Sequence, residues 1–214
     1  MDSESKPRPS EFWDGFYRER DRVWSGNPNA ALVREVGMLA PGRALELGCG
    51  EGADAIWLAQ RGWTVTGIDI SAVALGRAAQ HADEAGVADR VAWLRRDLAE
   101  WEPEGEYDLV SAQFLHSPVD LPRARILRAA AAAVAPGGLL VVVGHAAFPP
   151  WHAGEETHGE GAELPTAEEL AASLGLRAGG WSVEATTTEG REAVGPEGQR
   201  VVLTDAVLTA RRGG

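Results

Sequence analysis

Three glycines alternate along the segment between Glu46 and Ala53, at Gly48, Gly50 and Gly52. Because glycine has no side chain, such a loop lets a ligand approach the backbone closely. The segment follows a short apolar run and precedes a helical pattern, which is where open α/β sheets bind ligands. Glu46 places a carboxylate at the start of the loop, and this favours a ligand that carries positive charge. The glycine spacing also differs from the Gly-x-Gly-x-x-Gly pattern of dinucleotide-binding loops.

Two further acids follow predicted strands farther along the chain. Asp69 comes about twenty residues after the glycine-rich loop, the spacing at which an acid accepts the hydroxyl groups of a ribose. Ile70 can pack on a purine ring. Asp97, followed by Leu98, comes at the end of the next strand and can accept a hydrogen bond from an exocyclic amine. Together these residues predict a site for a nucleoside.

Histidines are the candidate general bases, since the unperturbed pKa of histidine lies near neutrality. His116 follows the fourth predicted strand, and His145 ends the fifth. Either could instead accept a hydrogen bond from the backbone. His81 lies in a helical pattern with polar neighbours and is expected to face solvent. His152 and His158 lie in an acidic segment, but their spacing matches no familiar metal site, so no metal is predicted.

The strands and helices that position these residues are predicted from residue 43 onward, where short apolar runs alternate with helical patterns. Such alternation indicates parallel strands joined by crossover helices. The predicted strands are 44–47, 64–68, 91–94, 107–112 and 139–144, and the predicted helices are 53–61, 71–85 and 121–135. Pro136, Gly137 and Gly138 predict a turn before the fifth strand. A helix that Thr166 caps and two closely joined strands, 181–188 and 200–210, complete the chain; these strands are expected to be antiparallel.

The N-terminal region has a different character. Residues 1–10 are predicted to be a disordered tail, and residues 11–42 a helical lid or extension on a domain that spans 43–214. Aromatic residues recur with helical spacing and are expected to share one face of a short helix; they are Phe12, Trp13, Phe16 and Tyr17. Polar residues, Asp14 among them, are expected on the opposite face.

Composition and charge exclude several classes of protein. The 214 residues include 32 acids and 20 bases, for a net charge of −12, which argues against nucleic acid as a partner because such binding needs a basic footprint. The chargeless run 129–148 is interrupted by Pro136 and two glycines, so no membrane span is predicted. The one cysteine, Cys49, indicates a reducing compartment. Cys49 lies between glycines, where a small side chain fits, and is not expected to be a nucleophile. A cytoplasmic protein is expected.

The sequence resembles the class I S-adenosylmethionine-dependent methyltransferases over residues 11–212. The matching segments are ALELGCGEG (44–52), WLAQRGWTVTGIDIS (57–71), RRDL (95–98), EYDLVSA (106–112) and APGGLLVV (135–142). FWDGFY and RVWSGNPN resemble the thiopurine and tellurite-resistance branch of small-molecule methyltransferases. The resemblance implies a Rossmann-like, doubly wound α/β sheet of seven strands. This sheet would be mostly parallel with the last strand antiparallel, and an N-terminal helical extension would precede it.

The same resemblance assigns binding roles. The residues that would surround the methionyl part of S-adenosylmethionine are Glu46, Gly48, Cys49, Gly50 and Gly52. Those that would hold its ribose and adenine are Asp69, Ile70, Asp97 and Leu98. Gln113 would line the cofactor near its sulfonium, and Trp24 and Gly26 would close the site from the N-terminal side.

The expected activity is methyl transfer from S-adenosylmethionine to a small-molecule acceptor by in-line attack of a thiol, oxygen or nitrogen nucleophile. His116 or His145 would serve as the base for an oxygen acceptor. The protein would be a monomer or a homodimer. Two alternatives remain open from the sequence: a nicotinamide-dependent oxidoreductase, and a non-catalytic cofactor-binding protein with the same fold.

Overall fold

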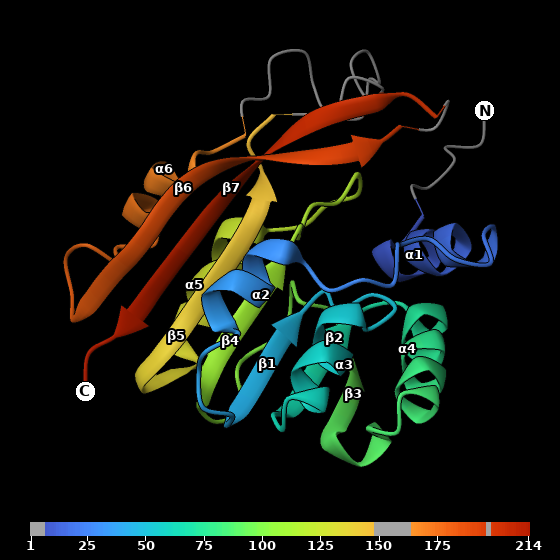
Figure 1. The fold of residues 1–214 in the computed structure, drawn as a ribbon, viewed down its shortest axis with the longest axis horizontal. Helices are drawn as coiled ribbons and strands as arrows, with labels where there is room; N and C mark the ends of the chain where they lie inside the picture. The colour runs from blue at the N-terminus through green and yellow to red at the C-terminus, as the bar shows by residue number, and fades with distance from the viewer. Residues whose placement is uncertain (1–6, 148–163, 196–197) are drawn as a thin grey trace. The chain divides into compact units, whose positions relative to one another are not determined.

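The computed structural model describes residues 7–147, 164–195 and 198–214 (Figure 1). The chain divides into two compact units. The first comprises Met1–Glu102 and Val119–Pro122, and the second comprises Pro103–Pro118 and Arg123–Gly214. The acidic segment with His152 and His158 lies outside the described residues, as does most of the predicted N-terminal tail.

The first unit contains three parallel strands in the order β3-β2-β1. They are β1 (Arg43–Leu47), β2 (Thr64–Asp69) and β3 (Val91–Arg95). The register aligns Leu47 with Ile68, and Asp69 with Arg95. Because the strands are parallel and in this register, the residues that follow β1, β2 and β3 lie along one edge of the sheet.

Helices surround these strands. They are α1 (Pro9–Arg18), α2 (Ala30–Val36), α3 (Ala53–Gln60), α4 (Ala72–Glu84) and the short 3-10 helix η1 (Ala88–Arg90). Helix α3 packs on β1 and β2, α4 packs on β2 and β3, and α1 packs on α4. Asn29 and Ser71 begin α2 and α4 by accepting the backbone N–H groups of Ala31 and Ala74, as N-cap residues do.

The second unit contains four strands in the order β4-β5-β7-β6. Its elements are β4 (Tyr107–Gln113), α5 (Arg123–Ala132), β5 (Val134–His145), α6 (Ala167–Ser173), β6 (Trp181–Val194) and β7 (Arg200–Arg212). Strands β4 and β5 are parallel, whereas β7 is antiparallel to both β5 and β6. The predicted α/β class is therefore confirmed, with mostly parallel strands and an antiparallel β7.

The predicted turn at Pro136, Gly137 and Gly138 is wrong, because these residues lie inside β5. Tyr107 pairs with Val134, and Leu109 pairs with Leu139, so β5 carries extra residues in a bulge. A Cβ on Gly138 would lie 2.9 Å from the carbonyl oxygen of Ala135, which explains why glycine occupies this position. Thr166 and Glu169 cap α6 reciprocally, as predicted.

The core of the second unit centres on β5. Its residues from Leu139 to Val143 are all buried, as expected for a strand covered on both faces. In the first unit, Leu45, Leu47 and Ile68 are buried to a similar degree. Burial of such side chains stabilises a fold by roughly 1.5–3 kcal/mol each.

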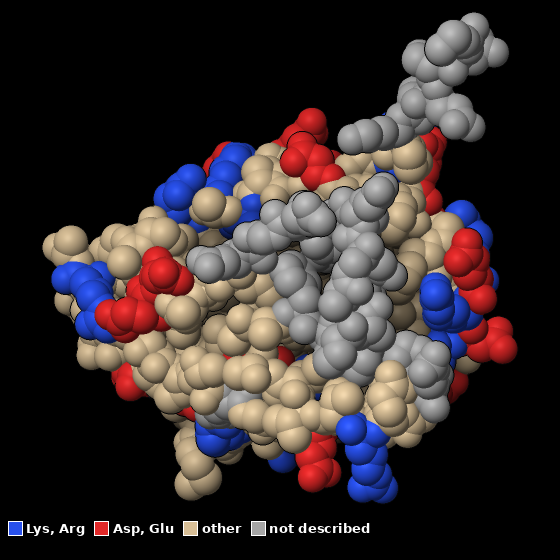
Figure 2. All heavy atoms as spheres, turned by 90° about the horizontal axis from the view of Figure 1, so that it is seen from above, with Lys and Arg blue, Asp and Glu red and all other residues tan. Residues whose placement is uncertain are grey.

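The surface mixes charges of both signs. On the face that Figure 2 shows, Arg side chains lie scattered among Asp and Glu side chains, and the described residues form no broad basic surface there. Within the part of the chain that the structure describes, no helix is both long enough and apolar enough to cross a membrane.

Candidate functional site

The glycine-rich loop joins β1 to α3 and is held against β2. The backbone N–H groups of Gly48 and Cys49 both donate to the carbonyl oxygen of Ile68, at 2.8 and 3.0 Å. Gly48, Gly50 and Gly52 have φ angles of 68°, 53° and 85°, a region that glycine adopts without steric cost. The alternate glycines thus allow a backbone conformation that would be strained with other residues at these positions.

Close packing under the loop gives a second reason for glycine. A Cβ on Gly52 would lie 2.7 Å from the ring of Trp93 and 2.9 Å from the Cβ of Ala78. A Cβ on Gly67 would meet the same ring at 2.7 Å and the sulfur of Cys49 at 3.1 Å. Burial, with the nearby charges of Asp69 and Glu46, raises the pKa of the Cys49 thiol well above its usual value. The neutral, buried thiol has the character of a packing residue.

Asp69 connects the loop to the end of β2. Its carboxylate accepts the backbone N–H of Gly50 at 2.9 Å and that of Ser71 at 2.8 Å. Burial raises the pKa of Asp69, although these hydrogen bonds oppose the shift. The carboxylate therefore fixes the position of Gly50, in the middle of the loop.

Glu46 is a buried acid with an unsatisfied oxygen. Its side chain is 3% exposed, and Oε2 has no hydrogen-bond partner among the described residues. Burial first, and then the charges of Asp54 and Asp69, raise the pKa of Glu46 well above its usual value, against a hydrogen bond from the backbone of Ala55. Burial also raises the pKa of Asp54 to about 6, although the N–H of Asn29 donates to it. A cationic ligand would relieve this crowding of carboxyl groups.

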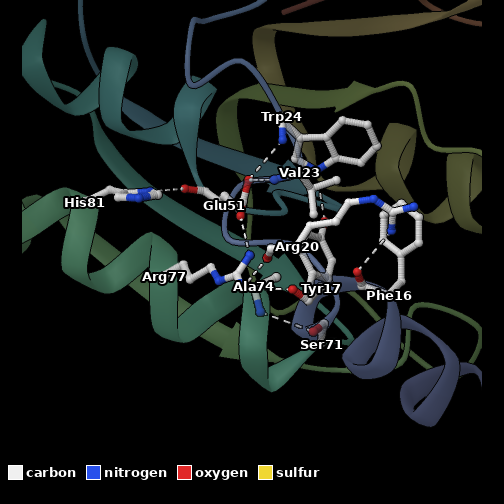
Figure 3. A network of polar contacts seen from close by, with 10 residues as sticks. All are labelled: Phe16, Tyr17, Arg20, Val23, Trp24, Glu51, Ser71, Ala74, Arg77 and His81. Atoms are coloured by element: carbon white, nitrogen blue, oxygen red, sulfur yellow. Dashed lines mark hydrogen bonds and ion pairs between the residues drawn. The ribbon is translucent and has the colours of Figure 1, made fainter. Parts of the chain in front are cut away.

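A network that the sequence analysis missed ties the same loop to the N-terminal segment (Figure 3). Oε2 of Glu51 accepts the backbone N–H groups of Val23 and Trp24 at 3.2 and 3.1 Å. Oε1 of Glu51 pairs with Nη1 of Arg77 at 2.8 Å. Nη2 of Arg77 also donates to the carbonyl oxygens of Tyr17 and Arg20, at 2.8 and 2.7 Å. The loop, α4 and the segment after α1 are therefore joined through Glu51 and Arg77.

Two aromatic side chains and a histidine extend the network. The indole N–H of Trp24 donates to the hydroxyl of Tyr17 at 3.0 Å, and a Cβ on Gly50 would lie 3.0 Å from that hydroxyl. Burial raises the pKa of Tyr17. Nδ1 of His81 lies 3.1 Å from the carbonyl oxygen of Glu51, and His81, which was expected to face solvent, is half-buried.

Asp14, which was expected on the helix face opposite the aromatic residues, is buried. Asp14 is 8% exposed and accepts the hydroxyl of Ser71 at 2.7 Å and the N–H of Val73 at 3.3 Å. These donors, with Arg95 and Arg18 nearby, hold its pKa below the usual value although burial opposes the shift. Tyr17 is buried on the same helix, whereas the aromatic residues clustered around it are half-buried; they are Phe12, Trp13 and Phe16.

The remaining predicted binding residues are distributed over both units. In the first unit, Asp97 accepts the N–H of Ala99 at 2.8 Å beside the buried Leu98, and Ile70 follows Asp69. Trp24 is 50% exposed, and Gly26 has a φ of 75°. Gln113 belongs to the second unit, where it donates to Ser111 at 2.8 Å while its buried Oε1 has no partner among the described residues.

The two candidate bases lie together in the second unit, with a carboxylate that sequence reasoning missed. His145 and Asp205 are partners across the β5–β7 pair, and Nδ1 of His145 lies 3.4 Å from Oδ1 of Asp205. Arg191 donates to Asp205 from Nε at 2.6 Å and from Nη2 at 3.3 Å. Although burial opposes ionisation, His145 and Arg191 hold the pKa of Asp205 below its usual value.

His116 and Phe114 complete this group. Nε2 of His116 accepts the backbone N–H of His145 at 3.2 Å, and the two imidazole rings stack 5.4 Å apart. The Phe114 ring lies 4.6 Å from the His145 ring. Phe114 has a φ of 48° and is the one non-glycine residue with positive φ in the described ranges. Strain of this kind tends to concentrate at functional sites.

The sequence and fold are similar to those of known methyltransferases. Residues 44–138 match a family model described as a methyltransferase domain. A ubiquinone biosynthesis O-methyltransferase from Burkholderia ambifaria (strain MC40-6) is 45% identical over 101 residues, which are 47% of this chain and 43% of that protein. The matched region thus spans less than half the length of this curated relative.

Two solved structures cover nearly the whole chain. One structure comes from work on the conversion of a disulfide bond into a thioacetal group during echinomycin biosynthesis. Its sequence is 26% identical to this chain, and the two folds agree with a TM-score of 0.69. The match covers 95% of this chain and 93% of the other. The other is magnesium protoporphyrin IX methyltransferase from Synechocystis PCC 6803 with bound S-adenosylhomocysteine. It is 21% identical to this chain and has a TM-score of 0.68, and the match covers 95% of this chain and 97% of the other. The glycine-rich loop, Asp69 and Asp97 all fall within the family match. The chain is thus similar to methyltransferases in sequence over residues 44–138 and in fold over nearly its whole length.

Proposed function

We propose that this chain binds S-adenosylmethionine in its first unit and transfers the methyl group to a small-molecule acceptor. The observation that carries the proposal is Glu46, whose buried Oε2 lacks a partner among the described residues, beside the glycine-rich loop. The α-ammonium of the methionyl group is a cation of the kind that would neutralise this carboxyl group. A phosphate-bearing nicotinamide cofactor would instead place negative charge near Glu46, Asp54 and Asp69.

The other predicted residues receive complementary roles in this proposal. The backbone of Gly48, Gly50 and Gly52 lets the methionyl part approach closely. The carboxylate of Asp69 retains lone pairs for the ribose hydroxyl groups beyond those that Gly50 and Ser71 use. The adenine would be held by Ile70, Asp97 and Leu98.

We also propose that the N-terminal segment forms part of the site. Trp24, whose backbone N–H is bonded to Glu51 of the loop, presents a half-exposed indole, and Gly26 follows it. An aromatic face within about 6 Å of a cation attracts it by roughly 0.5–2 kcal/mol. A segment in this position would also exclude water from the methyl group.

The cofactor supplies a methyl group activated by its sulfonium, so the acceptor forms a bond to carbon as the carbon–sulfur bond breaks and sulfur keeps the electron pair. The protein must align the acceptor and receive its proton. Alignment of this kind can lower a barrier by roughly 7–11 kcal/mol. The similar proteins include an O-methyltransferase and the structure associated with conversion of a disulfide bond into a thioacetal group. These two similarities support hydroxyl and thiol acceptors.

For an oxygen acceptor we assign the base to His145. Asp205 lies beside Nδ1 of His145 and favours the tautomer with its proton on that nitrogen, which leaves Nε2 as the proton acceptor. His116 uses Nε2 to accept the backbone N–H of His145, so its role in the proposal is to position that backbone. Carboxylate, imidazole and acceptor would then form a chain of the kind that orients general bases.

Calorimetry tests the cofactor assignment. We expect the protein to bind S-adenosylhomocysteine and not NAD. Glu46→Gln should weaken S-adenosylhomocysteine, which has the ammonium group, and leave methylthioadenosine, which lacks it, unchanged. Asp69→Asn should weaken both, by roughly 1–3 kcal/mol for each lost hydrogen bond. Glu168→Gln, an exposed change in the other unit, is the control. NAD binding, or equal effects of Glu46→Gln on both ligands, would contradict the assignment.

Turnover against a panel of thiols, phenols and amines tests the activity. His145→Ala should abolish methylation of phenols with little change in cofactor affinity, and added imidazole should restore part of it. Asp205→Asn should lower kcat more than it raises KM. A protein that binds the cofactor but methylates no member of the panel would favour the non-catalytic alternative.

A further inference from the structure

Arg123, the first residue of α5, is a charged side chain without a partner among the residues that the structure describes. No hydrogen bond or ion pair to Arg123 occurs among the residues that the structure describes, and its Nε is buried and unsatisfied. Burial lowers the pKa of the guanidinium. Since a guanidinium remains protonated in proteins, Arg123 holds a positive charge that nothing on the described chain neutralises.

Three other arginines of the same unit have carboxylate partners. Arg191 binds Asp205, Arg211 binds Glu184 and Arg212 binds Glu106. Asp205 is also the one buried carboxylate that the described part of this unit contains, and its oxygens are already engaged by Arg191 and His145. Partial burial of an unpaired charge is costly, so an arginine in this position without a partner among the described residues suggests that a bound anion pairs with it.

Arg123 lies at the histidine pair. A Cβ on Gly144 would be 3.2 Å from Nη2 of Arg123 and 3.1 Å from Nε2 of His116. The guanidinium and the His116 imidazole therefore both reach the same point on β5, one residue before His145. Glycine at position 144 leaves the space that the two side chains occupy.

We propose that Arg123 binds a carboxylate on the methyl acceptor, so that the acceptors of this protein are acidic small molecules. The inference rests on the proposed function, because it places the acceptor beside His145. Arginine suits the role, since its planar fork of N–H donors matches a carboxylate in bidentate geometry. The anion would neutralise Arg123 while the thiol or hydroxyl group of the same molecule faces the proposed base.

The test uses acceptor pairs that differ in charge and little in shape. They are 3-mercaptopropionate against 3-mercaptopropionamide, and 4-hydroxybenzoate against 4-hydroxybenzamide. In the wild-type protein, kcat/KM should favour the acid of the pair that is turned over by about tenfold or more, the range expected for a charged hydrogen bond. Arg123→Gln should abolish the preference through KM, and Arg123→Lys should retain part of it. Arg128→Gln, an exposed change on the same helix, should leave it intact.

A stability measurement separates this role from a structural one. Arg123→Met should leave the Tm of the ligand-free protein unchanged or raise it, because the variant removes a half-buried charge that has no partner among the described residues. A fall of several degrees would show that Arg123 has an internal partner and would overturn the proposal. Equal kcat/KM for acid and amide in the wild-type protein would also overturn it.

Failure of the proposed function would give a different result. If no acceptor is methylated, the Tm of the wild-type protein with S-adenosylhomocysteine should still rise more with 4-hydroxybenzoate than with its amide. Arg123→Gln should remove that difference. Anion binding of this kind would support the Arg123 site while contradicting methyl transfer, and its absence would overturn the site.

Discussion

Ser71 donates its hydroxyl to Asp14 across 2.7 Å, so that the residue that caps α4 also satisfies a buried carboxylate on α1. The bond joins residues 57 positions apart in the sequence. It anchors α1 to the same segment that follows Asp69, and thus sets the start of the N-terminal segment relative to the glycine-rich loop.

Removing the Ser71 hydroxyl should destabilise the protein. Ser71→Ala leaves Asp14 with fewer donors in a buried position, a change that costs roughly 1–3 kcal/mol. Because the pKa of Asp14 lies below its ordinary value of 3.8, its contribution is present above that pH and is lost as pH falls through the folded-state pKa. Urea denaturation measures both effects. Glu11→Gln, which breaks the exposed pair with Arg8, should have little effect.

Glu51→Ala should release the segment after α1. The variant removes the acceptor for the N–H groups of Val23 and Trp24 and the partner of Arg77. We expect trypsin to cleave after Arg20 and Arg22 faster than in the wild-type protein, while the urea midpoint changes less than in Ser71→Ala. Unchanged cleavage would show that other contacts hold the segment. Added S-adenosylhomocysteine should slow cleavage in the wild-type protein if the segment closes the site.

The stability of the ligand-free protein should vary with pH because of Asp54. Its folded-state pKa of about 6 lies above the ordinary 3.8, so the folded state binds a proton more tightly than the unfolded chain. The free energy of unfolding should therefore fall as pH rises between these two values. Glu46, whose pKa is also raised, should act in the same direction. Asp54→Asn should flatten this dependence in urea denaturation, and an unchanged slope would assign the effect elsewhere.

Gly52→Ala should destabilise the protein by more than the backbone strain alone. A left-handed φ costs a non-glycine residue roughly 1–2 kcal/mol, and the new Cβ would also collide with Trp93 and Ala78. Gly86→Ala is the matched control, since Gly86 has a φ of 70° and nothing within 4 Å of its added Cβ. Equal losses in the two variants, measured by thermal unfolding, would mean that Trp93 moves aside without cost.

The loop was predictable because its signal is local. A strand, alternating glycines and a helix follow one another within a short stretch, and the acid at Asp69 ends the next strand. The bulge in β5 shows the limit of such signals, since Pro136 and two glycines mark a turn and a bulge alike. Only the pairing of β5 with β4 distinguishes the two.

The buried polar contacts were not predictable in this way. The burial of Asp14 does not follow from the helical pattern, because the Ser71 hydroxyl that satisfies it is distant in sequence. Asp205 and Arg191 are likewise brought to His145 by the register of β5, β7 and β6. Arg191 lies beyond the predicted end of its strand at 188, so the sequence offered no alternation from which its face could be read.

The dependence of α1 on Ser71 and Arg77 has a consequence for the order of folding. During synthesis α1 leaves the ribosome before α4, and the groups that satisfy Asp14 and hold the carbonyl oxygens of Tyr17 and Arg20 follow nearly 60 residues later. Closing so long a loop costs entropy before any contact is gained. Helix α1 is therefore expected to dock after β1, β2 and α4 have assembled, although it precedes them in the chain.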